Sequence, residues 1–311
     1  MGLLNSIRIH GGFFKSLKFL IYTKSGRRKI DEEIDTLFFF LNNNTDITNC
    51  PKAKGNLRIL HENNLLLLTM FDKICKNEGW TYWLDSGTLL GAIRHNGFIP
   101  WDDDMDVGMP RSDYDEAVKK LPEIFAKMNI KMTCGINPGT NALGIGIDHE
   151  KTGTYCDIFP YDSCSSSELS EKDVSDAVIK AHRFYNRHIG IRRQKCDEYL
   201  KATFDKNGKQ DYFFYSPNLL FDEKYYSEQN IFKKEDIFPL KKHKFEDLEF
   251  NVPNNSQKFL VALYGNHYME YPRTGILHHG VFRPPLSEWI VLNNVDVDEL
   301  RTRVEAEIQK L

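Results

Sequence analysis

The stretch from residue 82 to residue 110 constrains this chain more than any other. It reads YWLDSGTLLGAIRHNGFIPWDDDMDVGMP and holds four glycines and five carboxylates in fewer than thirty residues. Glycine has no side chain to pack, and a carboxylate is seldom buried without a partner, so this composition is poor core material. The stretch is therefore predicted to form a site, and we expect the function of the chain to lie there.

Closely spaced aspartates end the stretch: Asp102, Asp103, Asp104 and Asp106. They follow Pro100, and we expect a short strand that is entered through this proline. Side chains alternate along a strand, which puts Asp102, Asp104 and Asp106 on one face and Trp101, Met105 and Val107 on the other. Like charges this close need neutralisation, either by a divalent cation or by protons, which would raise the carboxylate pKa values. An oxygen-only site suits a hard ion, Mg²⁺ or Mn²⁺.

A glycine turn precedes the aspartates. Residues 82–84 are predicted to form a strand, residues 85–88 a tight turn, and residues 89–94 a helix. A glycine turn that opens a helix exposes backbone N–H donors and the positive end of the helix dipole, and both bind phosphate. An ordinary strand-to-helix connection has the same pattern, but Asp-x-Asp on the next strand favours a phosphate site beside a metal.

These residues resemble the LicD family, which includes bacterial phosphocholine transferases and is similar to the fukutin-related proteins. The matching words lie at 82–107, at 157–160 (DIFP) and, more loosely, at 245–253 and 263–272. The wider nucleotidyltransferase pattern is a Gly-Ser turn followed by Asp-x-Asp, and Thr88 stands here in place of the serine. The resemblance implies an α/β (mixed α+β) fold, with a nucleotidyltransferase-like mixed sheet flanked by helices and helical additions at both ends.

The resemblance also implies an activity. It is the transfer of a phosphorylated small alcohol, phosphocholine or similar, from a CDP-linked donor such as CDP-choline to a sugar hydroxyl, with release of CMP. Choline, glycerol and ribitol phosphates all fit. The acceptor would be a glycan or lipid-linked saccharide of a cell-surface polysaccharide such as lipopolysaccharide or teichoic acid, and no nucleic acid partner is expected. The alternatives are a glycosyltransferase that binds a nucleotide sugar through Asp-x-Asp, and a non-catalytic metal-binding protein.

Metal ligands follow from the same resemblance. In the superfamily the two aspartates of Asp-x-Asp, here Asp104 and Asp106, bind metal together with a third aspartate on a neighbouring strand. Asp157 fits the third position, and Asp148 is the alternative. Asp104, Asp106 and Asp157 are thus the expected catalytic and metal-binding residues, and Asp157 is also a candidate for the base that deprotonates the acceptor.

Substrate contacts are expected from the turn and the helix behind it. Gly87 and Thr88 would bind phosphate through the backbone and the hydroxyl group. Arg94 would neutralise the phosphate of the departing nucleotide, although a surface arginine is an equal alternative. Asp85 and Asp102 would orient the site and carry charge.

The first thirty residues differ in charge from the rest of the chain. They hold seven basic residues and no acid, and because the whole chain carries −3, the remainder carries −10. Aromatic and aliphatic residues are interleaved with the bases, as in a segment that lies on an anionic membrane surface. The alternative is a basic helix docked on the acidic body of the same chain. We therefore expect a basic N-terminal segment (1–50), a catalytic domain (51–290) and a C-terminal helix (291–311).

The six cysteines are irregularly spaced without a CxxC pair, and lysines interrupt the apolar residues near the start, unlike a secretion signal. No apolar run has the length needed to span a bilayer. We interpret the cysteines as reduced thiols and expect a cytoplasmic protein, which would be peripheral on the inner face of the membrane if the N-terminal segment binds lipid.

Periodicity predicts further elements. Residues 57–79 give the best helical pattern, and Gly79 is its expected end. Strands are predicted at 129–134, 143–148, 154–159 and 245–252. Ser256 is expected to cap a helix that ends at Gly265, and a last helix is expected to start near Asp296.

Overall fold

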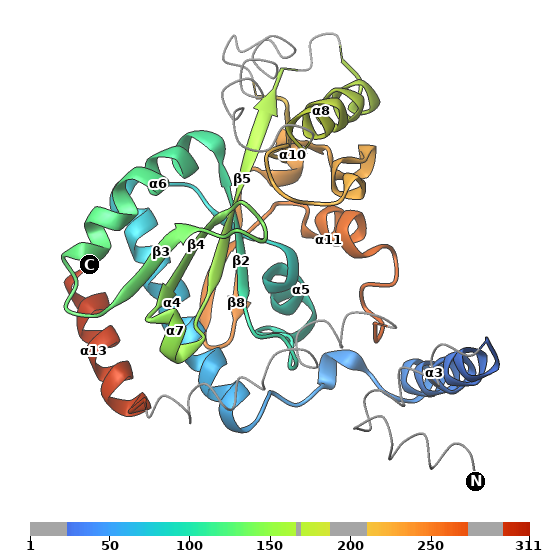
Figure 1. Cartoon of the computed structure of the whole chain (residues 1–311), viewed down its shortest axis with the longest axis horizontal. Coiled ribbons are helices and arrows are strands. Elements are labelled where there is room, and N and C mark those ends of the chain that lie inside the picture. Colours follow the sequence, from blue (N-terminus) through green and yellow to red (C-terminus); the bar gives the residue numbers. More distant parts are fainter. Residues whose placement is uncertain (1–23, 166–168, 187–209, 273–294) are drawn as a thin grey trace, which may run out of the picture.

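The chain folds around a mixed β-sheet that is flanked by helices (Figure 1), as the sequence predicted. The computed structural model describes residues 24–165, 169–186, 210–272 and 295–311, with side chains from residue 32 onward. The strands of the main sheet in these ranges are β1 (Trp83–Leu84), β2 (Met105–Pro110), β3 (Met132–Ile136), β4 (Leu143–Ile147), β5 (Cys156–Cys164), β6 (Tyr212–Tyr215) and β7 (Phe232–Lys233).

The strand order is β1-β2-β5-β4-β3, and β5 is the central strand. Its neighbour β2 runs parallel to it, whereas β4 pairs antiparallel with its first residues. The last residues of β5 pair with β6, which in turn pairs with β7. In the parallel pair Asp106 lies opposite Asp157, so the hydrogen-bond register itself brings two acids of distant sequence side by side.

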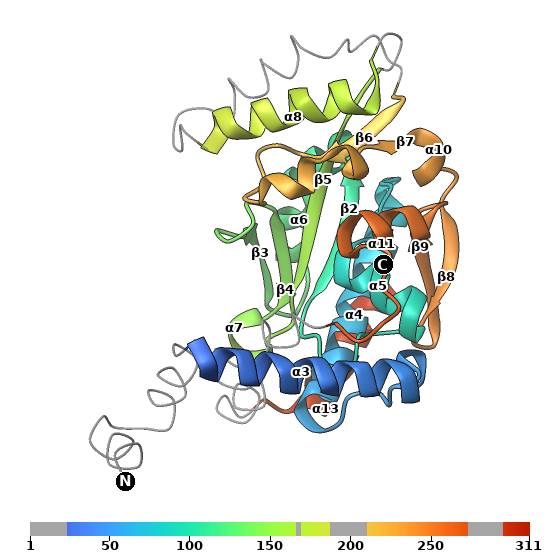
Figure 2. The same ribbon diagram turned by 90° about the vertical axis from the view of Figure 1, so that its right-hand side faces the viewer.

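Helices cover both faces of the sheet (Figures 1 and 2). In both views α4, α6 and α13 lie on one side of the sheet, and α5 and α11 lie on the other. The helices are α3 (Lys24–Asn44), α4 (Gly55–Glu78), α5 (Ser86–His95), α6 (Arg111–Ala126), α7 (His149–Thr152), α8 (Glu171–Asn186), α10 (Lys234–Ile237), α11 (Ser256–Tyr264) and α13 (Val297–Lys310). Short 3₁₀ turns are η1 (Ile47–Asn49), η2 (Glu223–Tyr226) and η3 (Glu228–Asn230).

Helix α4 matches the predicted helix closely. Its apolar positions recur every three to four residues, and Leu60, Leu68 and Phe71 are almost completely buried. Gly79 ends the helix in the left-handed conformation, with φ of 73°, and its N–H donates to the carbonyl of Cys75. The sequence therefore specified both the buried face and the end of this helix.

The strand that carries the acids is shorter than expected. We predicted that it is entered through Pro100, but it begins at Met105, and the N–H of Asp102 donates to the carbonyl of Ile99 in a turn, at 3.0 Å. The alternation of faces holds only within β2, where Met105 and Val107 are fully buried and Asp106 faces the other way. Asp102 and Asp104 belong to the loop before the strand.

A hairpin replaces the single strand that we predicted at 245–252. It consists of β8 (Lys241–Phe245) and β9 (Leu248–Val252), paired antiparallel. The turn begins at Glu246, which has a positive φ of 56° without being glycine, so residue type did not reveal it. Beside the hairpin, α11 starts with Asn255 as its cap, not Ser256, because the Asn255 side chain accepts the N–H of Lys258. Its predicted end at Gly265 is confirmed.

Helix α13 packs on α4. Asp296 caps its first turn by accepting the N–H of Glu299, as predicted. The Lys73 ammonium group donates to the carbonyl of Ile308 at 2.8 Å, and Val304 is fully buried in the common core. The C-terminal helix is thus part of the same packed body.

Among the described residues, none of the helices is long and apolar enough to cross a bilayer. The cysteines in these ranges are free thiols: Cys50, Cys75, Cys134, Cys156 and Cys164. Cys196 and all seven basic residues before Asp31 lie outside the described residues or side chains.

Candidate active site

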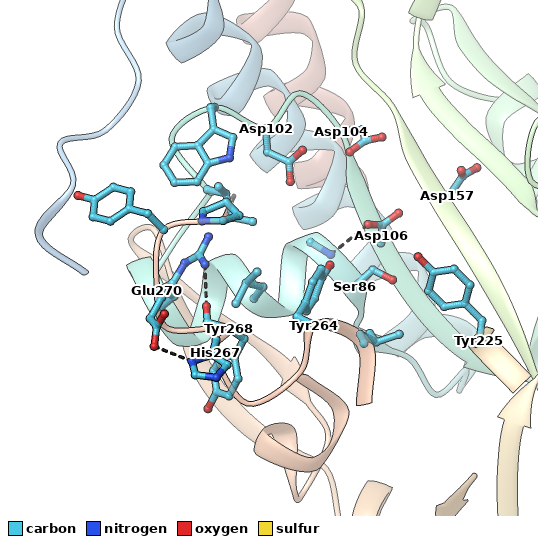
Figure 3. A pocket seen from close by; sticks show the side chains of 18 of the residues that line it. Ser86, Asp102, Asp104, Asp106, Asp157, Tyr225, Tyr264, His267, Tyr268 and Glu270 are labelled. Carbon is cyan, nitrogen blue, oxygen red and sulfur yellow. Dashed lines mark hydrogen bonds and ion pairs between the residues drawn. The ribbon is translucent and has the colours of Figure 1, made fainter. Parts of the chain in front are cut away.

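A cavity of about 840 Å³ lies at the start of α5, next to β2 and β5 and closed on other sides by α11 and α3 (Figure 3). Asp102, Asp104, Asp106 and Asp157 all line it. In the close-up these four carboxylates follow one side of the cavity, while His267 and Glu270 lie at the opposite end. The alternative third ligand, Asp148, does not line the cavity and pairs with Lys131 at 2.8 Å.

The four aspartates come from two strands and a loop. Asp106 and Asp157 sit opposite each other on β2 and β5, and Asp102 and Asp104 come from the loop before β2. Within the described part of the chain, one group of three ligand side chains has its ligand atoms within 4.8 Å of one another, and it is Asp102, Asp103 and Asp104. The expected set of Asp104, Asp106 and Asp157 lines the same cavity with wider mutual spacing.

Burial and mutual repulsion disfavour the charged form of these acids. The pKa of Asp106 is raised well above its ordinary value, first by burial and then by the charges of Asp104 and Asp157. Burial also raises the pKa of Asp157, while hydrogen bonds from Asn137 and Thr140 oppose the rise. The Asn137 amide donates to both Asp157 oxygens, at 2.9 and 3.1 Å. A divalent cation would remove the repulsion, and the oxygen-only donor set fits a hard ion.

Helix α4 holds the acidic loop in place. The Nε2 of His61 donates to the carbonyl of Asp102 at 2.7 Å, and the Asn64 amide donates to the carbonyl of Asp103 at 3.3 Å. The Asn64 carbonyl oxygen accepts the N–H of Tyr155, just before β5. We missed these two residues in the sequence, although polar residues buried on an apolar helix face are a signal for such contacts.

Asp85 lies beneath the glycine turn and is fully buried. Its oxygens accept hydrogen bonds from the hydroxyl groups of Tyr161, at 2.8 Å, and Tyr215, at 3.0 Å, and from the N–H of Ser86, at 2.8 Å. Burial raises its pKa to about 6, against the effect of these hydrogen bonds. Asp85 does not line the cavity, and its hydrogen bonds support the turn.

The two residues expected to bind phosphate occupy different positions. Gly87 lines the cavity, and a Cβ atom there would come within 2.8 Å of an Asp102 carboxylate oxygen, so a larger residue would displace the Asp102 side chain. Its N–H donates to Asp106 at 3.3 Å. Thr88 does not line the cavity. Its hydroxyl group accepts the N–H of Asp106 at 2.8 Å.

Arg94 lies in the cavity wall and is only 3% exposed, which excludes the surface alternative. It donates to the carbonyl of Tyr268 at 2.7 Å and to Nε2 of His95 at 2.9 Å, and its guanidinium group stacks over Trp101. Among the described residues no carboxylate lies within 4.0 Å of it. Burial lowers its pKa to about 10, so it keeps its charge at neutral pH.

Aromatic side chains complete the wall, and sequence reasoning had not assigned them to the site. They are Phe38, Trp101, Phe159, Tyr215, Phe221, Tyr225, Tyr264, Tyr268 and Tyr271. The aromatic-rich stretch 212–226 was the available signal for several of them. The cavity therefore combines an acidic side, a buried arginine and an aromatic lining.

Several known proteins are similar to this chain in sequence. A model of the LicD/FKTN/FKRP nucleotidyltransferase domain family matches residues 79–189. The lipopolysaccharide cholinephosphotransferase LicD of Haemophilus influenzae is 30% identical over 251 residues, covering 67% of this chain and 89% of that protein. An uncharacterized protein of Rickettsia prowazekii is 24% identical over 208 residues, covering 66% of this chain and 54% of that protein. The human ribitol 5-phosphate transferase FKRP is 54% identical over 36 residues, 12% of this chain and 7% of that protein.

Proposed function

Since the chain belongs to the LicD family and is a transferase of that type, we propose that it moves a phosphorylated small alcohol from a CDP-linked donor to a hydroxyl group of a glycan, releasing CMP. The names of its relatives include a choline phosphate and a ribitol 5-phosphate transferase, and both groups are phosphorylated alcohols. Likeness to transferases of phosphoryl-type groups supports this class over the nucleotide-sugar glycosyltransferase and over a non-catalytic metal-binding protein.

One observation carries the proposal. Asp106 and Asp157, opposite each other on parallel strands, face a cavity that also holds the Arg94 guanidinium group. A diphosphate needs positive charge on both of its phosphates, and a cation at the acids together with Arg94 would supply it from two sides. This distribution of charge suits a nucleotide diphosphate donor.

We propose Asp104, Asp106 and Asp157 as ligands of one or two Mg²⁺ or Mn²⁺ ions. Such ions, when bound, would draw charge from the donor diphosphate and favour in-line attack at its phosphorus. Asp102 adds negative charge at the same end of the cavity. A Cβ atom at Gly87 would press against the Asp102 carboxylate there.

The remaining chemistry is assigned to side chains of the chain itself. The acceptor hydroxyl oxygen forms a bond to the phosphorus that carries the alcohol, and the bond from that phosphorus to the bridging oxygen breaks. CMP leaves with the bonding electron pair, and Arg94 stabilises its phosphate. The acceptor proton moves to a carboxylate oxygen of Asp157, which lines the cavity.

The aromatic lining supports choline as the transferred alcohol. A quaternary ammonium group is attracted to the faces of aromatic rings, whereas a polyol needs a wall rich in hydrogen-bonding groups. Tyr225 and Tyr264 lie on either side of Ser86 near Asp106 in the close-up (Figure 3), within reach of a group attached to a phosphate bound there. We therefore expect CDP-choline to be preferred over the glycerol and ribitol donors.

A donor panel tests the proposal. The purified chain is incubated with Mg²⁺ and CDP-choline, CDP-glycerol or CDP-ribitol, together with glycan acceptors, and the products are weighed by mass spectrometry. CMP release with a matching gain in acceptor mass is the expected result. Release of a nucleoside diphosphate from a nucleotide sugar would support the glycosyltransferase instead, and no turnover of any donor would support a binding protein.

We assign this activity to residues 51–290, with residues 1–50 and 291–311 as additions at the two ends. The free thiols in the described ranges support a cytoplasmic location for the reaction.

A further inference from the structure

A side chain of helix α4 lies between the two chain segments that carry the acids of the site. Asn64 is completely buried. Its Oδ1 accepts the N–H of Tyr155 at 3.1 Å, and its Nδ2 donates to the carbonyl of Asp103 at 3.3 Å. Because a backbone N–H can only donate, the amide oxygen must face Tyr155, and the NH₂ group must then face Asp103. One side chain therefore links the residue before β5 to the loop before β2.

The ladder between β2 and β5 explains the position of this amide. Met105 pairs with Cys156, and the N–H of Met105 donates to the carbonyl of Tyr155 at 3.1 Å. In a parallel ladder with this register, the preceding bond would run from the N–H of Tyr155 to the carbonyl of Asp103. Asn64 binds these same two groups. Its side-chain amide thus replaces one backbone hydrogen bond, and its insertion holds the two segments further apart than a direct bond would.

The insertion lies where the acids of the site converge. Asp104 stands between Asp103, which Asn64 binds, and Met105, where the ladder begins. Asp106 and Asp157 are held opposite each other by the ladder itself. The distance of Asp104 from β5 therefore depends on Asn64, whereas the distance between the other two acids depends on the strands.

We propose that Asn64 is a positioning residue of the metal site. Its amide keeps the loop before β2 and the start of β5 at the separation at which Asp104 shares a divalent cation with Asp106 and Asp157. The inference rests on the metal ligands of the proposed function, and it adds a residue that does not line the cavity. Replacing a residue that orients metal ligands from behind commonly lowers metal affinity about ten- to hundredfold.

Mn²⁺ binding by the full chain tests the proposal, with free Mn²⁺ measured by electron paramagnetic resonance and no nucleotide present. Asn64→Leu keeps the approximate volume of the side chain and loses both hydrogen bonds, so the Kd for Mn²⁺ should rise about ten- to hundredfold. Asn63→Leu is the matched control. Asn63 is the preceding residue of α4 and is 2% exposed, and its side-chain oxygen has no hydrogen-bond partner among the described residues. This control should bind Mn²⁺ like wild type.

Hydrogen–deuterium exchange of the metal-free protein gives a second readout. Asn64→Leu should exchange faster than wild type in the peptides that contain Asp103 and Tyr155, because the two segments lose their link, and Asn63→Leu should not. If Asn64→Leu does not fold, Asn64→Ala takes its place. The smaller alanine leaves room for a water molecule between the two backbone groups, so its loss of Mn²⁺ affinity should be smaller but in the same direction.

Two results would overturn the proposal while leaving the metal site intact. Wild-type Mn²⁺ affinity in a folded Asn64 variant is the first, since a merely structural role would lower the free energy of unfolding alone. Equal losses of affinity in Asn64→Leu and Asn63→Leu are the second, because they would reflect the packing of α4. If wild type itself binds no Mn²⁺, the proposed metal ligands are wrong and this inference fails with them.

Discussion

Replacing Thr88 by valine separates two roles for its hydroxyl group. The sequence pattern assigned that group to phosphate, but in the structure it accepts the N–H of Asp106 at 2.8 Å. Strand β1 ends at Leu84, opposite Val107, so it does not reach this amide, and the Thr88 side chain takes the place of a strand partner. Valine has nearly the same shape and cannot accept the hydrogen bond.

Thr88→Val should lower the free energy of unfolding because the N–H of Asp106 loses its hydrogen-bond acceptor. Thr88 is only 5% exposed, and a shielded N–H without a partner costs about 1–3 kcal/mol. Urea unfolding should show this loss as a lower midpoint. Because the bond fixes the backbone of a proposed metal ligand, kcat should fall about tenfold or more while KM for the donor changes little. Thr88→Ser keeps the acceptor and should retain most of kcat, losing only about 0.8 kcal/mol with the methyl group.

Two results would refute this reasoning. Wild-type stability of Thr88→Val combined with a collapse of kcat would mean that the hydroxyl group acts on the substrate. Wild-type values of both quantities would mean that the hydrogen bond does not hold Asp106. Donor turnover is measured by CMP release, and stability by circular dichroism over the same urea series.

Three further changes test other parts of the structure. Asp106→Asn should abolish CMP release without lowering stability, since it removes a carboxylate charge that its neighbours repel. In differential scanning fluorimetry, Mg²⁺ should raise the thermal midpoint of wild type more than that of the variant. Equal shifts would argue against a metal at Asp106. Burial and the charge of Arg94 lower the pKa of His95 to about 4 in the folded chain. The unfolded chain therefore takes up the proton first as pH drops, and the free energy of unfolding should fall between about pH 6.5 and pH 4. His95→Asn should weaken this pH dependence, and an unchanged dependence would exclude His95 as its cause. In Gly91→Ala the new Cβ would lie 2.4 Å from a backbone carbonyl oxygen, and this clash should lower the free energy of unfolding in urea by about 1–3 kcal/mol. Gly135→Ala, where the Cβ would meet open space, should be nearly neutral. Equal losses in the two variants would contradict the packing around Gly91.

Local sequence signals predicted much of the fold because they act over a few residues. The apolar period of α4 and its glycine end are examples, and the Asp296 cap of α13 is another. The acids were recognised as a site because five carboxylates in one stretch have no role in a core. Asp106 and Asp157 line one cavity because the pairing of β2 with β5 sets them opposite each other.

Long-range contacts account for what the sequence did not predict. Asp85 is held by Tyr161 and Tyr215, which lie far along the chain and carry no local sign of a shared partner. The hairpin turn at Glu246 is a second case, because that side chain is buried against Lys52 and Arg58 from before and within α4. Such a contact stabilises a backbone conformation that the residue type disfavours.

The parallel ladder between β2 and β5 has a consequence for the evolution and engineering of this protein. The position of Asp157 relative to Asp106 is set by strand hydrogen bonds and not by the length of the chain between them. Insertions or deletions between α6 and the β3–β4 hairpin would therefore leave the two carboxylates in place. A shift of β5 by a single residue would turn Asp157 to the opposite face of the sheet. The chain between β2 and β5 can therefore vary in length, but neither strand can gain or lose a residue without moving its aspartate.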